Sequence, residues 1–207
     1  QYPDKEKTPR RYLSVTYSMP EWILKKWLEQ FDFQTVETIC QSMRKESPTC
    51  IRCNLSKATK EEIIKSLETQ NITVKEVPYL DYALEISDYN YLQAIQAFKD
   101  GLFQVQDVSS MLVAEIADPK WGNYCIDVCA APGGKSLHLS DKLAGSGYVE
   151  ARDLTDYKVE LMRENLERTK RINMEAIKQD ATIFDENSVE KADILLADLP
   201  CSGLGVM

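Results

Sequence analysis

The segment DVCAAPGGK (127–135) places two glycines and a lysine between an apolar run and a helical pattern. Glycine lets a ligand approach the backbone closely, and a helix beginning at such a turn points its first N–H groups and positive end at the ligand. The segment is neither G-x-G-x-x-G nor a phosphate-binding P-loop, because Cys129 stands where a P-loop has its first glycine. We therefore predict a ligand-binding turn and disfavour a nucleoside triphosphate site of the P-loop type.

Acidic residues end each of the four later segments that have the composition of buried strands. These residues are Asp127, Asp153, Asp180 and Asp198. Asp153 follows Lys135 by eighteen positions, where a ribose-binding carboxylate stands in adenosine-binding folds. Any one of the acids could cap the helix that follows it, but parallel strands deliver all of them to one edge of a sheet. We expect the four acids to surround a shared site.

The segment DLPCSG (198–203) places Cys201 close to Asp198 after the fourth strand. A thiol is a strong nucleophile only as the thiolate, and its ordinary pKa of about 8.5 leaves it mostly protonated at neutral pH. The proline and the small neighbours can hold the thiol toward the crevice of the sheet. A buried, inert cysteine is the alternative interpretation, but these neighbours favour a chemical role for Cys201.

Strand-like and helix-like segments alternate after Pro119, which is typical of a parallel sheet covered by helices. The predicted strands are YCIDVC (124–129), GYVEARD (147–153), EAIKQD (175–180) and ADILLAD (192–198), and the predicted helices lie near 135–143 and 156–172. The preceding segment GLFQVQDVSSMLVAEIADP reads as a connector, with a short strand and a helix capped by Asp107 or Ser109. The sequence therefore predicts an α/β domain that starts near residue 120.

The first half of the chain has a different pattern. Residues 1–18 are polar, contain two prolines and lack periodicity, so we expect an arm or a linker. Ser18 and Pro20 predict the start of a helix, and a second short helix follows. Residues 48–87 then read as a strand, an amphipathic helix and two further strands. This order predicts a small α+β unit.

The composition indicates a folded protein with reduced cysteines. The chain has 25 Lys and Arg against 33 Asp and Glu, and this net charge of −8 means that any RNA contact must be local. The sequence has neither an apolar run of about 18 residues nor a signal peptide, so we expect a cytoplasmic protein without a membrane segment or disulfide bonds. Cys50 and Cys53 lack further zinc ligands, so no metal is predicted, and His138 is expected at the surface or in packing.

Three motifs together resemble a known family. DVCAAPGGK, DLPCSG and GLFQVQDVSSMLVAEI (101–116) are similar to motifs of the RNA 5-methylcytosine methyltransferases of the RsmB/Sun type. YLSVTYSMPEWILKKW and TCIRCNLSK most resemble the bacterial members that act on 16S ribosomal RNA, and the likeness covers about residues 10–207. The resemblance implies an RNA-recognition-like α+β subdomain over 19–105 after an arm at 1–18. It also implies the first half of a Rossmann-like methyltransferase domain, with four strands, over 106–207.

The resemblance further implies S-adenosyl-L-methionine as the methyl donor and 16S ribosomal RNA as the partner. We expect a monomer. The donor would be held by Cys129, Ala130, Ala131, Pro132, Gly133, Gly134, Lys135, Asp153, Asp180 and Asp198. Such enzymes add a thiolate to C6 of cytosine so that C5 can attack the methyl group. We expect Asp198 to interact with the base, Cys201 to take part in the chemistry, and Lys135 to orient the carboxylates.

In this family the attacking cysteine lies in a downstream Thr-Cys motif, while the cysteine of DLPCSG assists product release. We therefore expect this chain to be a fragment that is inactive alone. Attack by Cys201 itself is a less favoured alternative. The alternative to an enzyme is a non-catalytic RNA-binding or ribosome-assembly protein that retains a cofactor-binding fold. An amino-group methyltransferase, with an aromatic loop expected where Cys201 stands, is the other enzyme considered.

Overall fold

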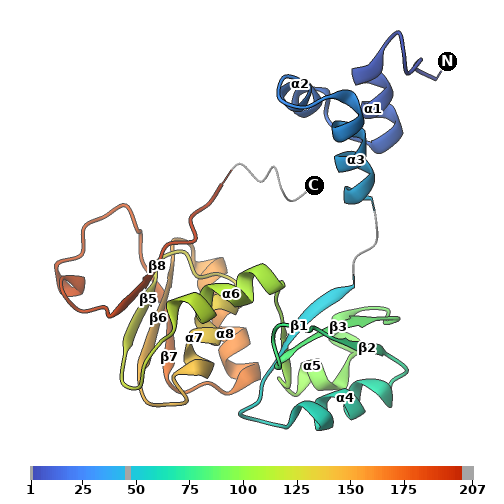
Figure 1. Ribbon diagram of the computed structural model, residues 1–207. Coiled ribbons are helices and arrows are strands. Elements are labelled where there is room, and N and C mark those ends of the chain that lie inside the picture. Colours follow the sequence, from blue (N-terminus) through green and yellow to red (C-terminus); the bar gives the residue numbers. More distant parts are fainter. Residues whose placement is uncertain (1, 45–47, 202–207) are drawn as a thin grey trace. The chain divides into compact units, whose positions relative to one another are not determined.

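The computed structural model describes residues 2–44 and 48–201, which divide into two compact units, one in each range (Figure 1). Within these ranges, no helix combines the length and the apolar character needed to cross a membrane.

The first unit is a three-helix bundle made of α1 (Pro9–Tyr17), α2 (Glu21–Leu28) and α3 (Phe33–Met43). Its helices share a core of Leu13, Met19, Ile23, Leu24, Val36 and Cys40. Asp32 begins α3 by accepting a hydrogen bond from the backbone N–H of Thr35, a standard N-cap contact.

The predicted arm at residues 1–18 is wrong, because residues 9–17 form α1. Pro9 stands at the start of this helix, where its missing N–H costs nothing, and Leu13 is fully buried against the other helices. Ser18 ends α1 in the left-handed conformation rather than capping α2. The division predicted after residue 18 therefore falls inside one shared core, and the helices of residues 19–44 pack with α1.

The second unit begins with an antiparallel sheet in the strand order β2-β3-β1-β4. Its elements are β1 (Thr49–Cys53), α4 (Lys60–Glu68), β2 (Thr73–Glu76), β3 (Ala83–Ser87), the 3-10 helix η1 (Leu92–Ala94), α5 (Gln96–Lys99) and β4 (Phe103–Val105). A capping box between Thr59 and Glu62 starts α4. The order of strands and helices is the βαββαβ arrangement of ferredoxin-like folds.

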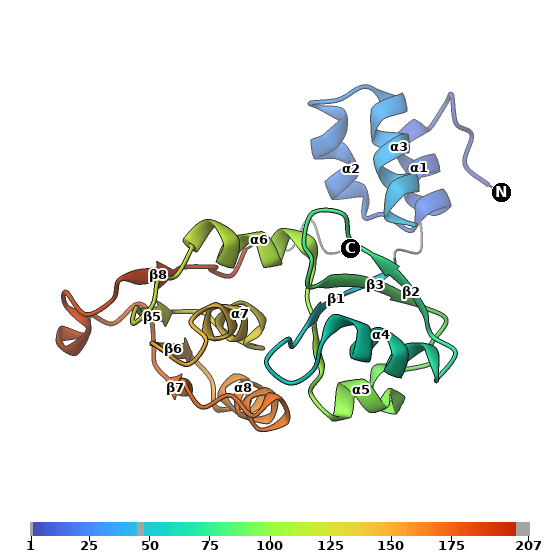
Figure 2. The same ribbon diagram turned by 60° about the horizontal axis from the view of Figure 1, so that its bottom comes forward.

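A parallel sheet in the order β7-β6-β5-β8 completes this unit. Its elements are α6 (Val108–Ala117), β5 (Tyr124–Asp127), α7 (Gly134–Lys142), β6 (Tyr148–Asp153), α8 (Asp156–Thr169), β7 (Met174–Lys178), the 3-10 helix η2 (Glu186–Ser188) and β8 (Ile194–Leu196). Inward residues such as Cys125, Val149 and Ala151 pack with Leu137, Leu139 and Met162 of α7 and α8, which lie along one face of the sheet (Figure 2). Because β6 and β8 flank β5 on opposite sides, the strand order reverses at the end of β5, where open α/β sheets bind ligands.

Buried charges join the two sheets of the second unit. The Arg52 side chain from β1, only 4% exposed, pairs with Asp141 of α7, which also pairs with Arg171. Arg168 at the end of α8 donates to the carbonyl oxygens of Phe98 (2.9 Å) and Phe103 (3.1 Å). The ferredoxin-like part is therefore fixed on α7 and α8 by directional bonds.

Gly101 lies where the two parts approach most closely. It has φ of +67°, and a Cβ added there would lie 2.1 Å from the carbonyl oxygen of Arg168. Gly122 has a similar φ of +84° with no atom within 4 Å of an added Cβ. The two glycines thus share a backbone conformation but differ in their surroundings.

We expect Gly101→Ala to lower the free energy of unfolding by about 3 kcal/mol, from the left-handed backbone plus the displacement of α8. Gly122→Ala should cost only about 1 kcal/mol, because the backbone term acts there alone. Urea unfolding of both variants measures the difference. Equal losses would show that the contact with Arg168 does not constrain the fold.

Candidate functional site

The glycine segment forms a tight turn between β5 and α7. The N–H of Ala130 donates a hydrogen bond to the carbonyl oxygen of Arg152 (2.9 Å). The N–H of Gly133 donates one to the carbonyl oxygen of Ala130 (2.7 Å). Gly133 has φ of +100°, which side chains disfavour, and α7 begins at the next residue. Asn165 of α8 donates to the Pro132 carbonyl oxygen at 3.0 Å. The predicted turn is therefore present, and the start of α7 faces the strand ends.

Asp127, at the end of β5, is buried beneath this turn. Its side chain accepts a hydrogen bond from the Ser136 hydroxyl at 2.6 Å and a longer one from the Cys129 N–H at 3.4 Å. Burial raises the pKa of Asp127, and the hydrogen bond from Ser136 opposes this effect. Asp127 thus ties the first turn of α7 to the strand.

Asp153, at the end of β6, anchors the other side of the turn. Its oxygens accept hydrogen bonds from the N–H groups of Ala131 (3.1 Å) and Leu154 (2.8 Å), and from the Lys158 ammonium (3.0 Å). Burial acts to raise its pKa, but these bonds outweigh burial and lower it. A carboxylate offers about four acceptor positions. Three donors therefore occupy all but one of the acceptor positions of the ionised Asp153.

Lys135 and Asp198 form an ion pair across the crevice, with 2.7 Å between Nζ and Oδ2. The Lys135 side chain is 23% exposed and that of Asp198 is 61% exposed. Both line a cavity of about 230 Å³ between the turn, the start of α6 and the end of β8. The other residues that line it are Val105, Gln106, Asp107, Ser110, Asp127, Cys129, Ala130, Ala131, Pro132 and Gly134.

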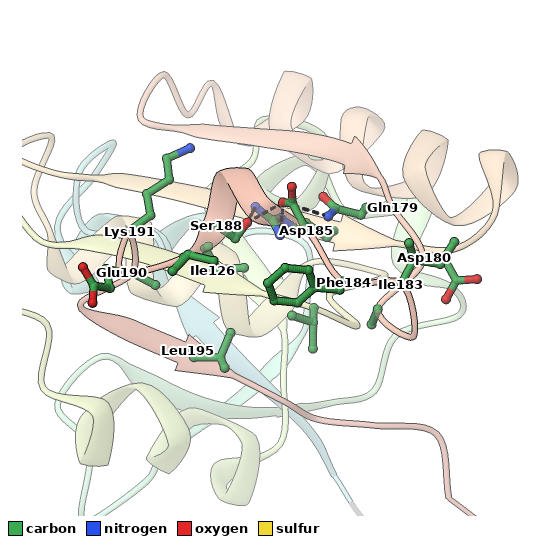
Figure 3. A pocket seen from close by; sticks show the side chains of 15 residues that line it. Ile126, Gln179, Asp180, Ile183, Phe184, Asp185, Ser188, Glu190, Lys191 and Leu195 are labelled. Atoms are coloured by element: carbon green, nitrogen blue, oxygen red, sulfur yellow. Dashed lines mark hydrogen bonds and ion pairs between the residues drawn. The ribbon is translucent and has the colours of Figure 1, made fainter.

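Asp180 lines a different cavity, of about 450 Å³, on the other face of the sheet. Figure 3 shows it at one end of this cavity, near Ile183 and Phe184, with Leu195 on the β8 side. Asp180 accepts hydrogen bonds from the Thr182 hydroxyl (2.7 Å) and N–H (2.9 Å), which lower its pKa. The structure therefore brings the four acids to the same edge of the sheet. Asp180, however, lines a separate cavity.

The two cysteines of the predicted site have different surroundings. Cys129 is half-buried in the turn, and burial raises its pKa, so the thiol is the dominant form at neutral pH. Cys201 is exposed, and the lining of the smaller cavity, as far as residues 2–44 and 48–201 form it, does not include it. Gln106, Asp107 and Ser110, predicted only as parts of a connector, also line the smaller cavity. The signal in the sequence is the position of Gln106 and Asp107 directly after a strand.

His138 lies on the buried side of α7. Of the two predicted positions, at the surface or in packing, the second is correct. The residue is 2% exposed, and its ring meets that of Tyr82 edge-on at 5.1 Å between centroids. Burial, and to a lesser degree Lys142, lowers the pKa of His138 from its usual 6.5 to about 4. The imidazole is therefore neutral at physiological pH.

Residues 114–207 match the family model described as 16S rRNA methyltransferase RsmB/F, and residues 19–91 match the model of the ferredoxin-like domain of the same group. The second match extends over α2 and α3 of the helical unit. The parallel sheet, the turn and the cavity thus define a methyltransferase fold of the Rossmann-like class. The predicted resemblance to the RsmB/Sun family is confirmed, as is the predicted fold class.

The chain is 33% identical over 205 residues to a probable ribosomal RNA small subunit methyltransferase B of Bacillus subtilis. This alignment covers 99% of the chain and 46% of that protein. It is 36% identical over 115 residues, 56% of this chain and 29% of the relative, to a tRNA (cytosine(72)-C(5))-methyltransferase of Pyrococcus horikoshii. The chain therefore spans less than half the length of these relatives.

Two solved structures have the same fold. The crystal structure of PH0851 has a TM-score of 0.85 and 27% identity, covering 97% of this chain and 46% of that one. The structure of NSun6 from Pyrococcus horikoshii with SFG has a TM-score of 0.76 and 20% identity, covering 96% of this chain and 71% of that one.

The buried His138 predicts a pH dependence of stability. The unfolded chain takes up a proton at this residue below about pH 6.5, whereas the folded chain holds it neutral down to about pH 4. Stability should therefore fall as the pH drops from 6.5 toward 4, by up to about 1.4 kcal/mol per pH unit from this group. Urea unfolding of wild type and His138→Gln at several pH values tests this, because the variant should have the shallower slope. Parallel slopes would contradict it.

Proposed function

We propose that the protein to which this chain belongs methylates C5 of a cytosine in small-subunit (16S) ribosomal RNA, with S-adenosyl-L-methionine as the methyl donor. The observation that carries the proposal is the cavity beneath the 129–135 turn, where the Lys135–Asp198 pair lies beside the start of α7. The family models and the names of the relatives support the reaction class.

The residues at the edge of the sheet fit the donor. Small-molecule sites measure roughly 300–1,000 Å³, so the cavity of about 230 Å³ suits one end of such a molecule. The cavity of about 450 Å³, with the apolar side chains of Ile183 and Phe184, suits the flat adenine ring. Asp153 lies at the end of the strand between β5 and β7 and keeps one acceptor position for a ribose hydroxyl. Cys129, Ala130, Ala131, Pro132, Gly133, Gly134, Lys135, Asp153, Asp180 and Asp198 remain the proposed donor-binding set.

The bound donor supplies an electrophilic methyl group. The role proposed for Asp198 is to share a proton with ring N3 of the cytosine, because its exposed carboxyl group faces the crevice from the end of β8. Lys135 holds this carboxylate at 2.7 Å and fixes its position at the crevice. Cys201, exposed three residues later, is proposed to assist product release, while a cysteine outside this chain attacks the ring.

Donor binding tests the cavity. In the full-length protein, Asp153→Asn should weaken the binding of S-adenosyl-L-methionine about tenfold or more, because it removes the charge that organises both the turn and the ribose contact. Asp156→Asn is the matched control, since that side chain is 85% exposed and pairs only with Lys178 among the described contacts. Isothermal titration calorimetry measures both affinities.

A folded full-length protein that binds no donor would reject the methyltransferase proposal in favour of a non-catalytic RNA-binding or assembly protein. Equal affinities of both variants and wild type would instead reject only the role of Asp153.

Trapping on RNA containing 5-fluorocytidine tests the reaction. The full-length enzyme should form an adduct that survives denaturation, because the fluorine blocks removal of the C5 substituent. Cys201→Ala should still form it, since the attacking thiol lies elsewhere. Loss of the adduct would make Cys201 the nucleophile, and absence of an adduct with wild type would favour amino-group methylation. Small-subunit ribosomal RNA should react in preference to tRNA, and the reverse preference would point to the activity named for the Pyrococcus relative.

A further inference from the structure

Gln106 has a buried amide that the fold leaves half satisfied. The residue follows β4, is 6% exposed and lines the cavity of about 230 Å³. Its oxygen accepts a hydrogen bond from Nε of Arg52 at 2.8 Å, whereas its nitrogen has no hydrogen-bond partner among residues 2–44 and 48–201. An unpaired buried amide donor costs about 1–3 kcal/mol, so such a group normally has a partner.

Arg52 decides which end of the amide remains for a ligand. A guanidinium only donates hydrogen bonds, so the amide oxygen must face Arg52 and the nitrogen must face away. Arg52 is itself held by its ion pair with Asp141 of α7. The nitrogen can reach an acceptor in the cavity through the last torsion of the side chain, which is broad for glutamine.

The start of α7 lies beside this amide. A Cβ added at Gly134, the first residue of α7, would be 3.9 Å from Cδ of Gln106. The first N–H groups of a helix have no intrahelical partner, and together with the helix dipole they favour an anion. The buried amide and the helix start thus offer donors to the same acceptor group.

The lining of the same cavity is also acidic. Asp107, Asp127 and Asp198 contribute carboxylates to it, and Lys135 pairs with Asp198. A ligand with an anionic group and a cationic group side by side matches both the donors and the carboxylates. The amino-acid end of S-adenosyl-L-methionine has this chemistry, and its size suits the cavity.

We propose that Gln106 donates a hydrogen bond from its amide nitrogen to the carboxylate of the methyl donor, beside the first turn of α7, and that Arg52 is the positioning residue that orients this amide. The inference rests on the proposed function, because it requires that the donor binds in this cavity. It also gives the ferredoxin-like part a role in donor binding, since Arg52 belongs to β1.

Gln106→Glu is the sharpest variant. It keeps an oxygen for Arg52 but replaces the donating nitrogen with a second acceptor, so the fold retains the bond that holds the side chain. Calorimetry on the full-length protein compares S-adenosyl-L-methionine with its decarboxylated form, which lacks only the carboxylate. Wild type should prefer the intact donor by ten- to a hundredfold, as expected for a hydrogen bond to a charged group of about 1.5–3 kcal/mol. Gln106→Glu should lose most of this preference while its affinity for the decarboxylated form changes little.

Arg52→Lys tests the positioning role. It keeps a positive charge near Asp141 but lacks the Nε–H that binds the amide, so it should also reduce the preference for the carboxylate. A purely structural role would lower both affinities in proportion and leave the preference unchanged.

Four outcomes separate the possibilities. A wild-type preference that survives in Gln106→Glu overturns the inference and leaves the proposed function intact, as does equal affinity of wild type for both ligands. Loss of RNA binding in Gln106→Glu with the donor preference unchanged would assign the amide to the RNA instead. Failure of wild type to bind either ligand would reject the proposed function itself.

Discussion

The reversal of strand order at the end of β5 is the constraint on which the site depends. Asp127 pairs in register with Ala151 of β6 on one side and with Leu196 of β8 on the other, so the chain that leaves β5 must pass between two neighbouring strand ends. A turn with a left-handed Gly133 brings it back over the sheet and into α7. The hydrogen bonds of Ala131 to Asp153 and of Ser136 to Asp127 fix that turn from both sides. The topology of the sheet therefore determines where the cavity lies. A few polar contacts determine its shape.

The polar interface between the two sheets adds a second layer of control. Burying charges is expensive, and a buried ion pair is weak evidence for stability, although removing one partner is strongly destabilising. The directional bonds of Arg52, Asp141 and Arg171 hold the ferredoxin-like part in one orientation. The selected orientation places the end of β4, with Gln106, against the start of α7. An apolar interface without directional bonds would hold the two parts together without fixing this orientation.

The sequence predicted the parallel sheet well, because near-continuous apolar runs such as YCIDVC and ADILLAD are typical of strands in parallel sheets. It failed at α1, where Pro9 looked like a helix breaker and Leu13 was too isolated to show a period. It could place the acids at one edge of the sheet but not divide them between two cavities, since that depends on which face each side chain takes after its strand. Gln106 could not be identified as a candidate donor from its residue type alone. The orientation of its amide depends on the hydrogen bond from Arg52, which lies far away in the sequence.

The charges at the edge of the sheet bear on how both reactants could be bound. Asp153 and Asp180 have lowered pKa values and stay ionised, and Lys158 and Lys135 pair with only two of the four acids, Asp153 and Asp198. Under the proposed function, this surplus of negative charge attracts a sulfonium cation and repels the phosphates of RNA. A single base could enter the crevice, while the backbone would have to be held at a distance from the edge. The net charge of −8 leads to the same conclusion, since affinity for RNA must then come from local contacts outside this cavity.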